Sequence, residues 1–258
     1  MYSRHRIAIL ALLLSAAAGL AADDIKPEAI LDKYVEVTGG KAAYEKVRTE
    51  IATGTLEITG MGLSGSITSY RAMPDKSYTV IDFGSVGKAE EGSNGQVAWS
   101  INGMEGARIK EGDERSTALR SNAMHGEIRW RDFYKSAELA GSEDIGGKPC
   151  YKIVLTPKDG PAETRYYDKA SNLLLKVVMP VTTPQGTATA EVTLADYKDE
   201  DGIKVAHTIT QSVPGAEILV KIAAVKHNPD IPSDRFDLPA DIKALMTAKK
   251  PNEKKTDK

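Results

Sequence analysis

Alternating apolar and polar residues dominate the chain from Thr49 onward. In residues 52–58, small or apolar side chains that include Leu56 and Ile58 alternate with threonine and glutamate, and residues 187–194 repeat this arrangement. A period of two directs every second side chain to the same face, so each stretch predicts a β-strand with one dry face. Further alternating stretches cover residues 97–101, 151–155, 173–179, 203–209 and 218–222.

Turn-forming pairs separate these predicted strands. Pairs of asparagine, aspartate, proline or glycine with a following glycine favour the tight turns of β-hairpins. They occur at Asn94-Gly95, Asn102-Gly103, Gly146-Gly147, Asp159-Gly160, Asp201-Gly202 and Pro214-Gly215. Short strands joined by such turns predict an antiparallel meander.

Helical spacing replaces the alternation near both ends and in one central segment. Apolar residues in 27–37 recur at helical intervals after Pro27, which predicts an amphipathic helix that Gly39-Gly40 ends. Residues 41–48 predict one or two further turns, and residues 242–246 predict a last helical turn. Residues 111–135 mix apolar and charged side chains without alternation, so we expect one or two helices that cross the sheet.

The N-terminal residues predict export. Basic residues Arg4 and Arg6 precede an apolar run from Ile7 to Leu20, and the small pair Ala21 and Ala22 follows. This order is typical of a secretory signal peptide, and the run is shorter than the roughly 20 apolar residues that a spanning helix needs. We expect cleavage after Ala21 or Ala22 and a periplasmic location, with an uncut membrane anchor as the alternative.

Composition favours one domain with its own core. After removal of residues 1–21, residues 22–247 suit a single large β domain, followed by a lysine-rich tail over residues 248–258. The net charge of -2 gives no general attraction to nucleic acid. The tail predicts a solvated disordered segment, with contact to an anionic membrane surface as the functional alternative.

A search for chemistry finds no motif in its required setting. The glycines of residues 60–65 resemble a dinucleotide-binding pattern, but the β-branched sequence that follows predicts a hairpin tip instead of the required helix. His125, His207 and His227 lack metal-ligand spacing. His207 falls on the dry face of its strand, where we expect a partner within the protein, with a ligand headgroup as the alternative.

Catalysis and redox chemistry receive no support from the sequence. No serine lies in a nucleophile elbow, and Cys150, the only cysteine of the mature chain, has no base beside it. It forms no internal disulfide and is expected to be a small buried hydrophobe and structural thiol. We therefore expect no enzymatic activity, cofactor or metal site.

Several segments resemble the outer-membrane lipoprotein-sorting family, the carriers related to LolA and LolB. The resemblance is carried by Gly39-Gly40-Lys41 leading into residues 54–58, and by residues 146–153, 164–168 and 173–177. Residues 234–239 are similar to the end of such domains. The resemblance implies a mainly β (α+β) fold, with a strongly curved antiparallel sheet or half-barrel, an N-terminal helix and a helical lid segment.

The family resemblance implies a monomeric carrier that holds a lipid or lipoprotein acyl chain in a hydrophobic cavity. The expected ligand-binding residues are Leu56, Ile58, Val97, Trp99, Ile101, Val192 and Leu194 as the cavity lining, with Ile128, Trp130 and Phe133 as the lid. Both tryptophans should then face one cavity from opposite walls. Each of these residues could equally belong to an ordinary core. The alternatives are an envelope protein-interaction module with a filled β core, and an enzyme with a polar constellation inside the cavity.

Overall fold

The computed structural model describes residues 25–183 and 186–248. The predicted signal peptide and the lysine-rich residues 249–258 lie outside the described residues. Within the described part, the helices are α1 (Pro27–Val37), α2 (Lys41–Tyr44), α3 (Gly112–Asn122), α4 (Trp130–Phe133) and α5 (Ala240–Ala248), with the 3-10 turns η1 (Gly84–Val86) and η2 (Ser233–Phe236).

The described residues also form one antiparallel sheet of thirteen strands. The first six strands are β1 (Thr49–Thr59), β2 (Leu63–Ala72), β3 (Lys76–Asp82), β4 (Lys88–Ser93), β5 (Ala98–Asn102) and β6 (Gly106–Ile109). The others are β7 (Tyr134–Ile145), β8 (Lys148–Pro157), β9 (Glu163–Asp168), β10 (Leu174–Thr183), β11 (Gly186–Glu200), β12 (Ile203–Val213) and β13 (Ala216–His227). Every predicted hairpin pair lies where one strand ends and the next begins, which confirms the meander.

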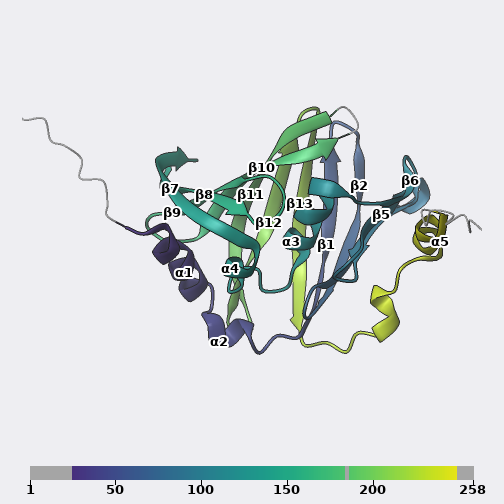
Figure 1. Cartoon of the computed structure of the whole chain (residues 1–258), viewed down its shortest axis with the longest axis horizontal. Coiled ribbons are helices and arrows are strands. Elements are labelled where there is room, and N and C mark those ends of the chain that lie inside the picture. The colour runs from purple at the N-terminus through teal and green to yellow at the C-terminus, as the bar shows by residue number, and fades with distance from the viewer. Residues whose placement is uncertain (1–24, 184–185, 249–258) are drawn as a thin grey trace, which may run out of the picture.

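The two edge strands of the sheet are consecutive in the sequence. The order runs from β6 down to β1, continues from β13 down to β7, and does not close. Because β6 and β7 are consecutive in the chain, residues 111–133 must pass from one edge of the sheet to the other. We call this segment the lid; its helices α3 and α4 lie between the two arms of the curved sheet in Figure 1.

Strand register defines two faces of the sheet. One row of paired residues runs from Leu56 through Val220 and Ile209 to Leu194. A parallel row starts at Ile58 and passes through Ile218, Gln211 and Val192 to Val177. These rows belong to the inner face, on which α1 and the lid lie. The opposite or outer face carries η2 against β3 and α5 against β6.

The main core fills the inner face of strands β7 to β10. Ile30, Leu31 and Tyr34 of α1 pack with Ile153 and other buried residues of these strands. Burying aliphatic and aromatic side chains is the dominant stabilising contribution in such a core, at about 1.5–3 kcal/mol for each fully buried side chain. The N-terminal helix, predicted over residues 27–37, thus closes one half of the half-barrel.

A smaller cluster joins α2 to the lid and to β12. It contains Tyr44, Met124 and Ile203. The hydroxyl of Tyr44 donates to Thr38 Oγ1 at 2.9 Å, which ties α2 to the end of α1. Gly39 must be glycine here, because its φ is 136° and a Cβ would approach the Gly202 carbonyl oxygen to 2.4 Å.

Two residues from the search for chemistry have partners within the fold. Cys150 is fully buried, its thiol donates to the Lys148 carbonyl at 3.3 Å, and burial raises the pKa of the thiol. His207 is also buried; its Nδ1 lies 3.0 Å from the Ile222 carbonyl oxygen and its Nε2 lies 2.9 Å from Glu200 Oε1. The expected internal partner of His207 is confirmed.

Candidate functional site

The middle of the inner face is apolar but incompletely covered. Ile58 of β1, Val192 and Leu194 of β11, Ile209 of β12 and Val220 of β13 are all only half-buried. The core cluster that contains α1 is centred on β7 to β10, and on the middle strands it is bordered only by Val192 and Leu194 of β11. A half-exposed apolar sheet face beneath a crossing segment is a candidate binding surface.

A cavity of about 220 Å³ lies at this place. Its wall combines side chains from α1, α2, the lid and the middle strands: Tyr34, Tyr44, Met124, Leu194, Ile209 and Ile222. A second cavity of about 330 Å³ lies between α3 and strands β10 to β12, with Lys110, Asp113, Glu114 and Gln211 in its more polar wall. The first cavity is the better candidate for an apolar ligand because of its aromatic and aliphatic lining.

Charged groups line one side of the first cavity. Glu50 of β1 lies 3.8 Å from Arg71 on β2 and 3.6 Å from the Nε2 of His227 on β13. Burial alone would raise the pKa of Glu50, but the nearby imidazole of His227 and the charge of Arg71 lower it overall. The nearby carboxylate of Glu50 raises the pKa of His227 against the effect of burial. This wall therefore places charged and titratable side chains beside an apolar pocket.

Arginines attach the C-terminal half of the lid to the β2–β3 turn and to α1. Arg129 pairs with Asp75 in the β2–β3 turn at 2.7 Å. Arg131 pairs with Asp32 of α1 at 3.0 Å, and the indole Nε1 of Trp130 donates to the same carboxylate at 3.4 Å. These pairs are partly exposed to solvent, so each holds the lid weakly, at roughly 0–1 kcal/mol.

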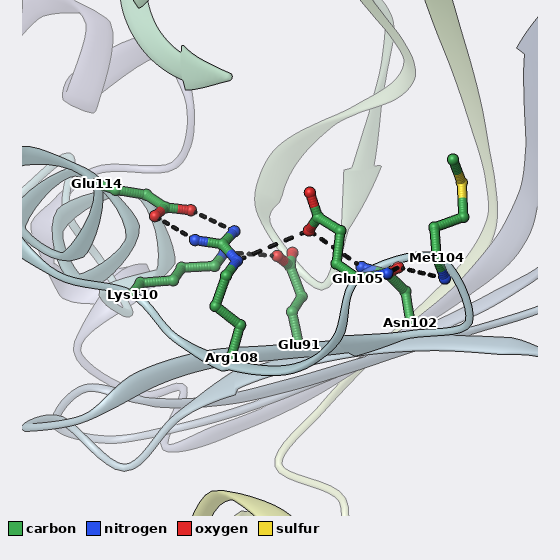
Figure 2. A network of polar contacts seen from close by, with 7 residues as sticks. All are labelled: Glu91, Asn102, Met104, Glu105, Arg108, Lys110 and Glu114. Atoms are coloured by element: carbon green, nitrogen blue, oxygen red, sulfur yellow. Dashed lines mark hydrogen bonds and ion pairs between the residues drawn. The ribbon is translucent and has the colours of Figure 1, made fainter. Parts of the chain in front are cut away.

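The N-terminal half of the lid is held by a network that Figure 2 shows. Lys110 pairs with Glu91 of β4 at 3.0 Å, and the guanidinium of Arg108 on β6 faces both carboxylate oxygens of Glu114 on α3. Arg115 adds hydrogen bonds to the Gln96 carbonyl in the β4–β5 turn. Helix α3 is thus fixed to the β4–β6 arm.

A buried charge cluster fixes the other end of α3. Arg120 lies 3.5 Å from Glu163 on β9, and both side chains are almost fully buried. Glu163 also accepts from the hydroxyl of Tyr134 and pairs with Arg165, both at 2.7 Å. Burial raises the pKa of Glu163, but the charges of Arg165 and Arg120 and the Tyr134 hydroxyl lower it overall. Among the described ion pairs of the lid, the Arg120–Glu163 pair is the most deeply buried.

The structure brings together only part of the predicted site. Leu56, Ile58, Val192 and Leu194 share the inner face, as expected. In the lid, Trp130 and Phe133 belong to the main core cluster, and Ile128 belongs to the smaller one. Val97 lies in the connection before β5 and is half-buried.

Trp99 and Ile101 do not belong to this site. Trp99 pairs with Gly92, which pairs with Tyr78, and this row continues through Tyr70 to Ile51 on the outer face. The indole of Trp99 lies 6.1 Å from the Tyr78 ring, and Arg235 of η2 stacks over Tyr78. The prediction that Trp99 and Trp130 face one cavity from opposite walls is therefore wrong, because the sheet separates them.

Several cavity residues were not predicted. Tyr34, Tyr44, Glu50, Arg71 and His227 all line the first cavity. A signal for Glu50 was present, since it falls in phase with Ala52, Leu56 and Ile58 on β1. Arg71 and His227 are the register partners of Glu50 on either side. Only strand pairing reveals that juxtaposition.

Comparison with solved structures identifies the fold. A DUF1329 family protein from Desulfovibrio piger matches with a TM-score of 0.57 at 16% identity, over 82% of this chain and 97% of that chain. A LolA superfamily protein from Nitrosomonas europaea matches with a TM-score of 0.57 at 12% identity, over 83% of this chain and 98% of that chain. An outer membrane lipoprotein-sorting protein domain from Vibrio parahaemolyticus matches with a TM-score of 0.53 at 15% identity, over 80% of this chain and 97% of that chain.

The chain therefore has the LolA-like fold, and the resemblance seen in the sequence is confirmed at that level. No protein-family model and no curated protein sequence matches it. Among residues 25–183 and 186–248, no helix is both long and apolar enough to cross a membrane.

Proposed function

We propose that this protein is a periplasmic carrier that holds a lipid-like ligand, such as an acyl chain, on the inner face beneath the lid. The observation that carries the proposal is the half-exposed apolar face of β1, β11, β12 and β13 under a segment that joins the two sheet edges. The lipoprotein-sorting domain among the solved neighbours has the same fold. The signal-peptide pattern of residues 1–21 supports the location.

Apolar burial supplies enough free energy for such a ligand. Each buried CH₂ contributes about 0.8 kcal/mol, so an acyl chain of a dozen carbons gains on the order of 10 kcal/mol before the costs of association. The polar wall formed by Glu50, Arg71 and His227 lies at one side of the cavity. It would contact the polar end of an amphiphile, while Leu194 and Ile209 contact its chain.

The size of the cavity requires the lid to move on binding. Small-molecule sites usually enclose about 300–1,000 Å³, and the present cavity holds about 220 Å³. The exposed pairs Arg129–Asp75 and Arg131–Asp32 are weak enough to break and reform. Ligand entry therefore takes place beneath the part of the lid around Met124 to Trp130, while the buried Arg120–Glu163 pair stays in place.

The test is mass spectrometry of organic extracts from protein purified from a periplasmic fraction, with a cavity-filling variant. Ala52 lines the cavity on the inner face of β1, so Ala52→Trp should fill it and abolish co-purified lipid. Ala224→Trp is the matched control, because Ala224 is exposed on β13 and pairs with the exposed Thr53. Urea unfolding shows whether both variants remain folded.

The outcomes separate the carrier from its alternatives. Lipid that co-purifies with the wild type and Ala224→Trp, and not with Ala52→Trp, supports the carrier. Equal lipid in all three proteins would place the ligand elsewhere. Wild-type protein that binds no lipid from extracts or added vesicles would instead favour an interaction module with a filled core.

A further inference from the structure

A groove adjoins the first cavity where the lid meets α2. It holds about 440 Å³ and is lined by residues of α2, the start of β1, the end of β2 and the lid. His125 and Val47 line both the groove and the cavity. The two hollows are therefore adjacent and meet at these two residues. We call this hollow the entry groove, because it lies at the part of the lid beneath which a ligand would enter.

A contact between His125 and Val47 closes the passage from the entry groove to the cavity. His125 Nε2 lies 2.6 Å from the Val47 carbonyl oxygen, which can only accept, so the ring nitrogen donates. The imidazole also packs edge-on against the Tyr44 ring, with the ring centroids 5.7 Å apart. Lid movement that separates His125 from Val47 would therefore join the entry groove to the cavity.

The entry groove continues the polar wall of the cavity along β1 and β2. Glu50 and Arg71 are register partners within that wall. Arg48 and Met73 are two residues further along in each case, and both line the entry groove. The Met73 N–H donates to the Arg48 carbonyl at 2.9 Å, which extends the pairing of the two strands. Entry groove, polar wall and apolar cavity thus follow one another along the start of β1.

Positive charge predominates in the entry groove. Among the described residues, its charged lining consists of Lys41, Arg48 and Arg129 against the carboxylate of Glu45. Arg129 is already paired with Asp75. Lys41 lies 3.6 Å from Glu45, but both side chains are exposed, so this pair is weak. Arg48 has no ion pair within the described part of the chain, which leaves Arg48 and Lys41 available to an anion.

The backbone of Arg48 is held firmly although its side chain is exposed. Its N–H donates to Asn228 Oδ1 at 2.7 Å, and Asn228 Nδ2 donates to the Lys46 carbonyl at 3.1 Å. Its carbonyl accepts from Met73. The guanidinium therefore starts from a fixed position at the end of the sheet. A guanidinium can donate two parallel hydrogen bonds to a phosphate or a carboxylate.

We propose that the entry groove binds the anionic group, a phosphate or a carboxylate, of an amphiphile whose chain lies in the first cavity. Arg48 and Lys41 contact the anion, and the polar wall of Glu50, Arg71 and His227 contacts the part of the polar end nearest to the chain. This inference rests on the proposed carrier function and names the class of its ligand. An amphiphile gains from both hollows, whereas a free anion gains only from the entry groove.

Calorimetry with two amphiphiles of equal chain length tests the preference for an anion. Decyl phosphate and decyl glucoside carry the same chain, and only the first is charged. The wild type should bind decyl phosphate about tenfold more tightly or better, because hydrogen bonds between ions are stronger than neutral ones. Arg48→Glu should abolish this preference and leave binding of decyl glucoside unchanged.

Lys226→Glu is the matched control for Arg48→Glu. Lys226 is exposed on β13 and pairs with Ile51 of the outer face, so its replacement makes the same change of charge away from the entry groove. It should retain the preference of the wild type. Lys41→Gln, at an exposed position of α2, should weaken the preference and serves as the second variant if Arg48→Glu does not fold. Urea unfolding checks the fold of each variant.

The outcomes separate this inference from the carrier function. A preference for decyl phosphate that Arg48→Glu abolishes and Lys226→Glu retains supports it. Equal wild-type affinity for both amphiphiles, or a preference that survives both Arg48→Glu and Lys41→Gln, would overturn it while the carrier function stands. Binding of neither amphiphile would overturn both. Inorganic phosphate that binds as tightly as decyl phosphate would assign the entry groove to a free anion and overturn the inference.

Discussion

Two parts of the inner face differ although their strands have the same alternating pattern. On β7 to β10, inward side chains such as Ile153 and Leu155 are fully buried beneath α1. On β11 to β13, inward side chains such as Leu194 and Ile209 remain half-exposed around a cavity. The difference lies in what covers the sheet. A helix with Ile30, Leu31 and Tyr34 fills one half, and a lid tied by ion pairs spans the other.

This comparison explains how one sheet can provide both stability and a binding surface. The filled half supplies close packing and a rigid frame. The middle strands are hydrogen-bonded into the same sheet, which holds their backbone in place. Their apolar side chains therefore need not pack closely against each other. Stability and ligand binding are therefore expected to respond to different substitutions.

Leu155→Ala should have the largest effect on stability. Leu155 is fully buried in the main core, so its truncation leaves a cavity and should lower the free energy of unfolding by about 2–5 kcal/mol. Leu194→Ala on the half-exposed part should cost about 1 kcal/mol. Urea unfolding of both variants measures the difference. Similar losses would mean that the middle strands are packed as tightly as the core.

Glu163→Gln should have the second-largest effect on the free energy of unfolding. Removing this carboxylate leaves Arg120 and Arg165 without their buried partner, at a cost of about 3 kcal/mol. The folded-state pKa of Glu163 lies below its unfolded value. Its contribution is therefore complete above about pH 4.3, the ordinary pKa of Glu, and is lost as the pH falls through the folded-state pKa. Urea unfolding should accordingly show a smaller difference in the free energy of unfolding between variant and wild type in acid.

Asp75→Asn should change lid motion more than stability. It removes the partner of Arg129 at a partly exposed pair, which should lower the free energy of unfolding by at most about 1 kcal/mol. A brominated acyl ligand should then quench Trp130 several-fold faster in stopped flow, with Trp99 replaced by Phe. Glu143→Gln, which breaks a similarly exposed pair with Lys152 on β7 and β8, should leave the rate unchanged.

His227→Gln should have a small effect on stability, and one that depends on pH. The nearby carboxylate of Glu50 raises the pKa of His227 in the folded state. This contribution, at most about 1 kcal/mol, is complete below the unfolded pKa near 6.5 and is lost as the pH rises through the higher folded-state value. The difference in the free energy of unfolding between the wild type and His227→Gln should thus be larger at pH 5.5 than at pH 9. A gap that is constant across this range would contradict the role of the charged pair.

Local sequence signals were sufficient for most of the fold. The helix over residues 27–37 was predicted with the observed bounds, because its apolar spacing, Pro27 and the two following glycines agree. The hairpin turns were predicted from pairs that contain glycine, because tight turns need the positive φ that glycine adopts and this requirement is visible in the local sequence. The cavity network was missed because Glu50, Arg71 and His227 come from three strands, and their meeting depends on register.

The sequence by itself determined which side chains of each strand share a face, since that follows from a period of two within one strand. It could not determine which face of the sheet that is. Trp99 and Leu56 both lie in alternating apolar stretches, yet register places them on opposite faces. Both faces of the β1–β6 arm have partners, because η2 and α5 cover part of the outer one. Only the tertiary structure decided which apolar rows became core and which line a cavity, because the helices that cover them come from distant segments.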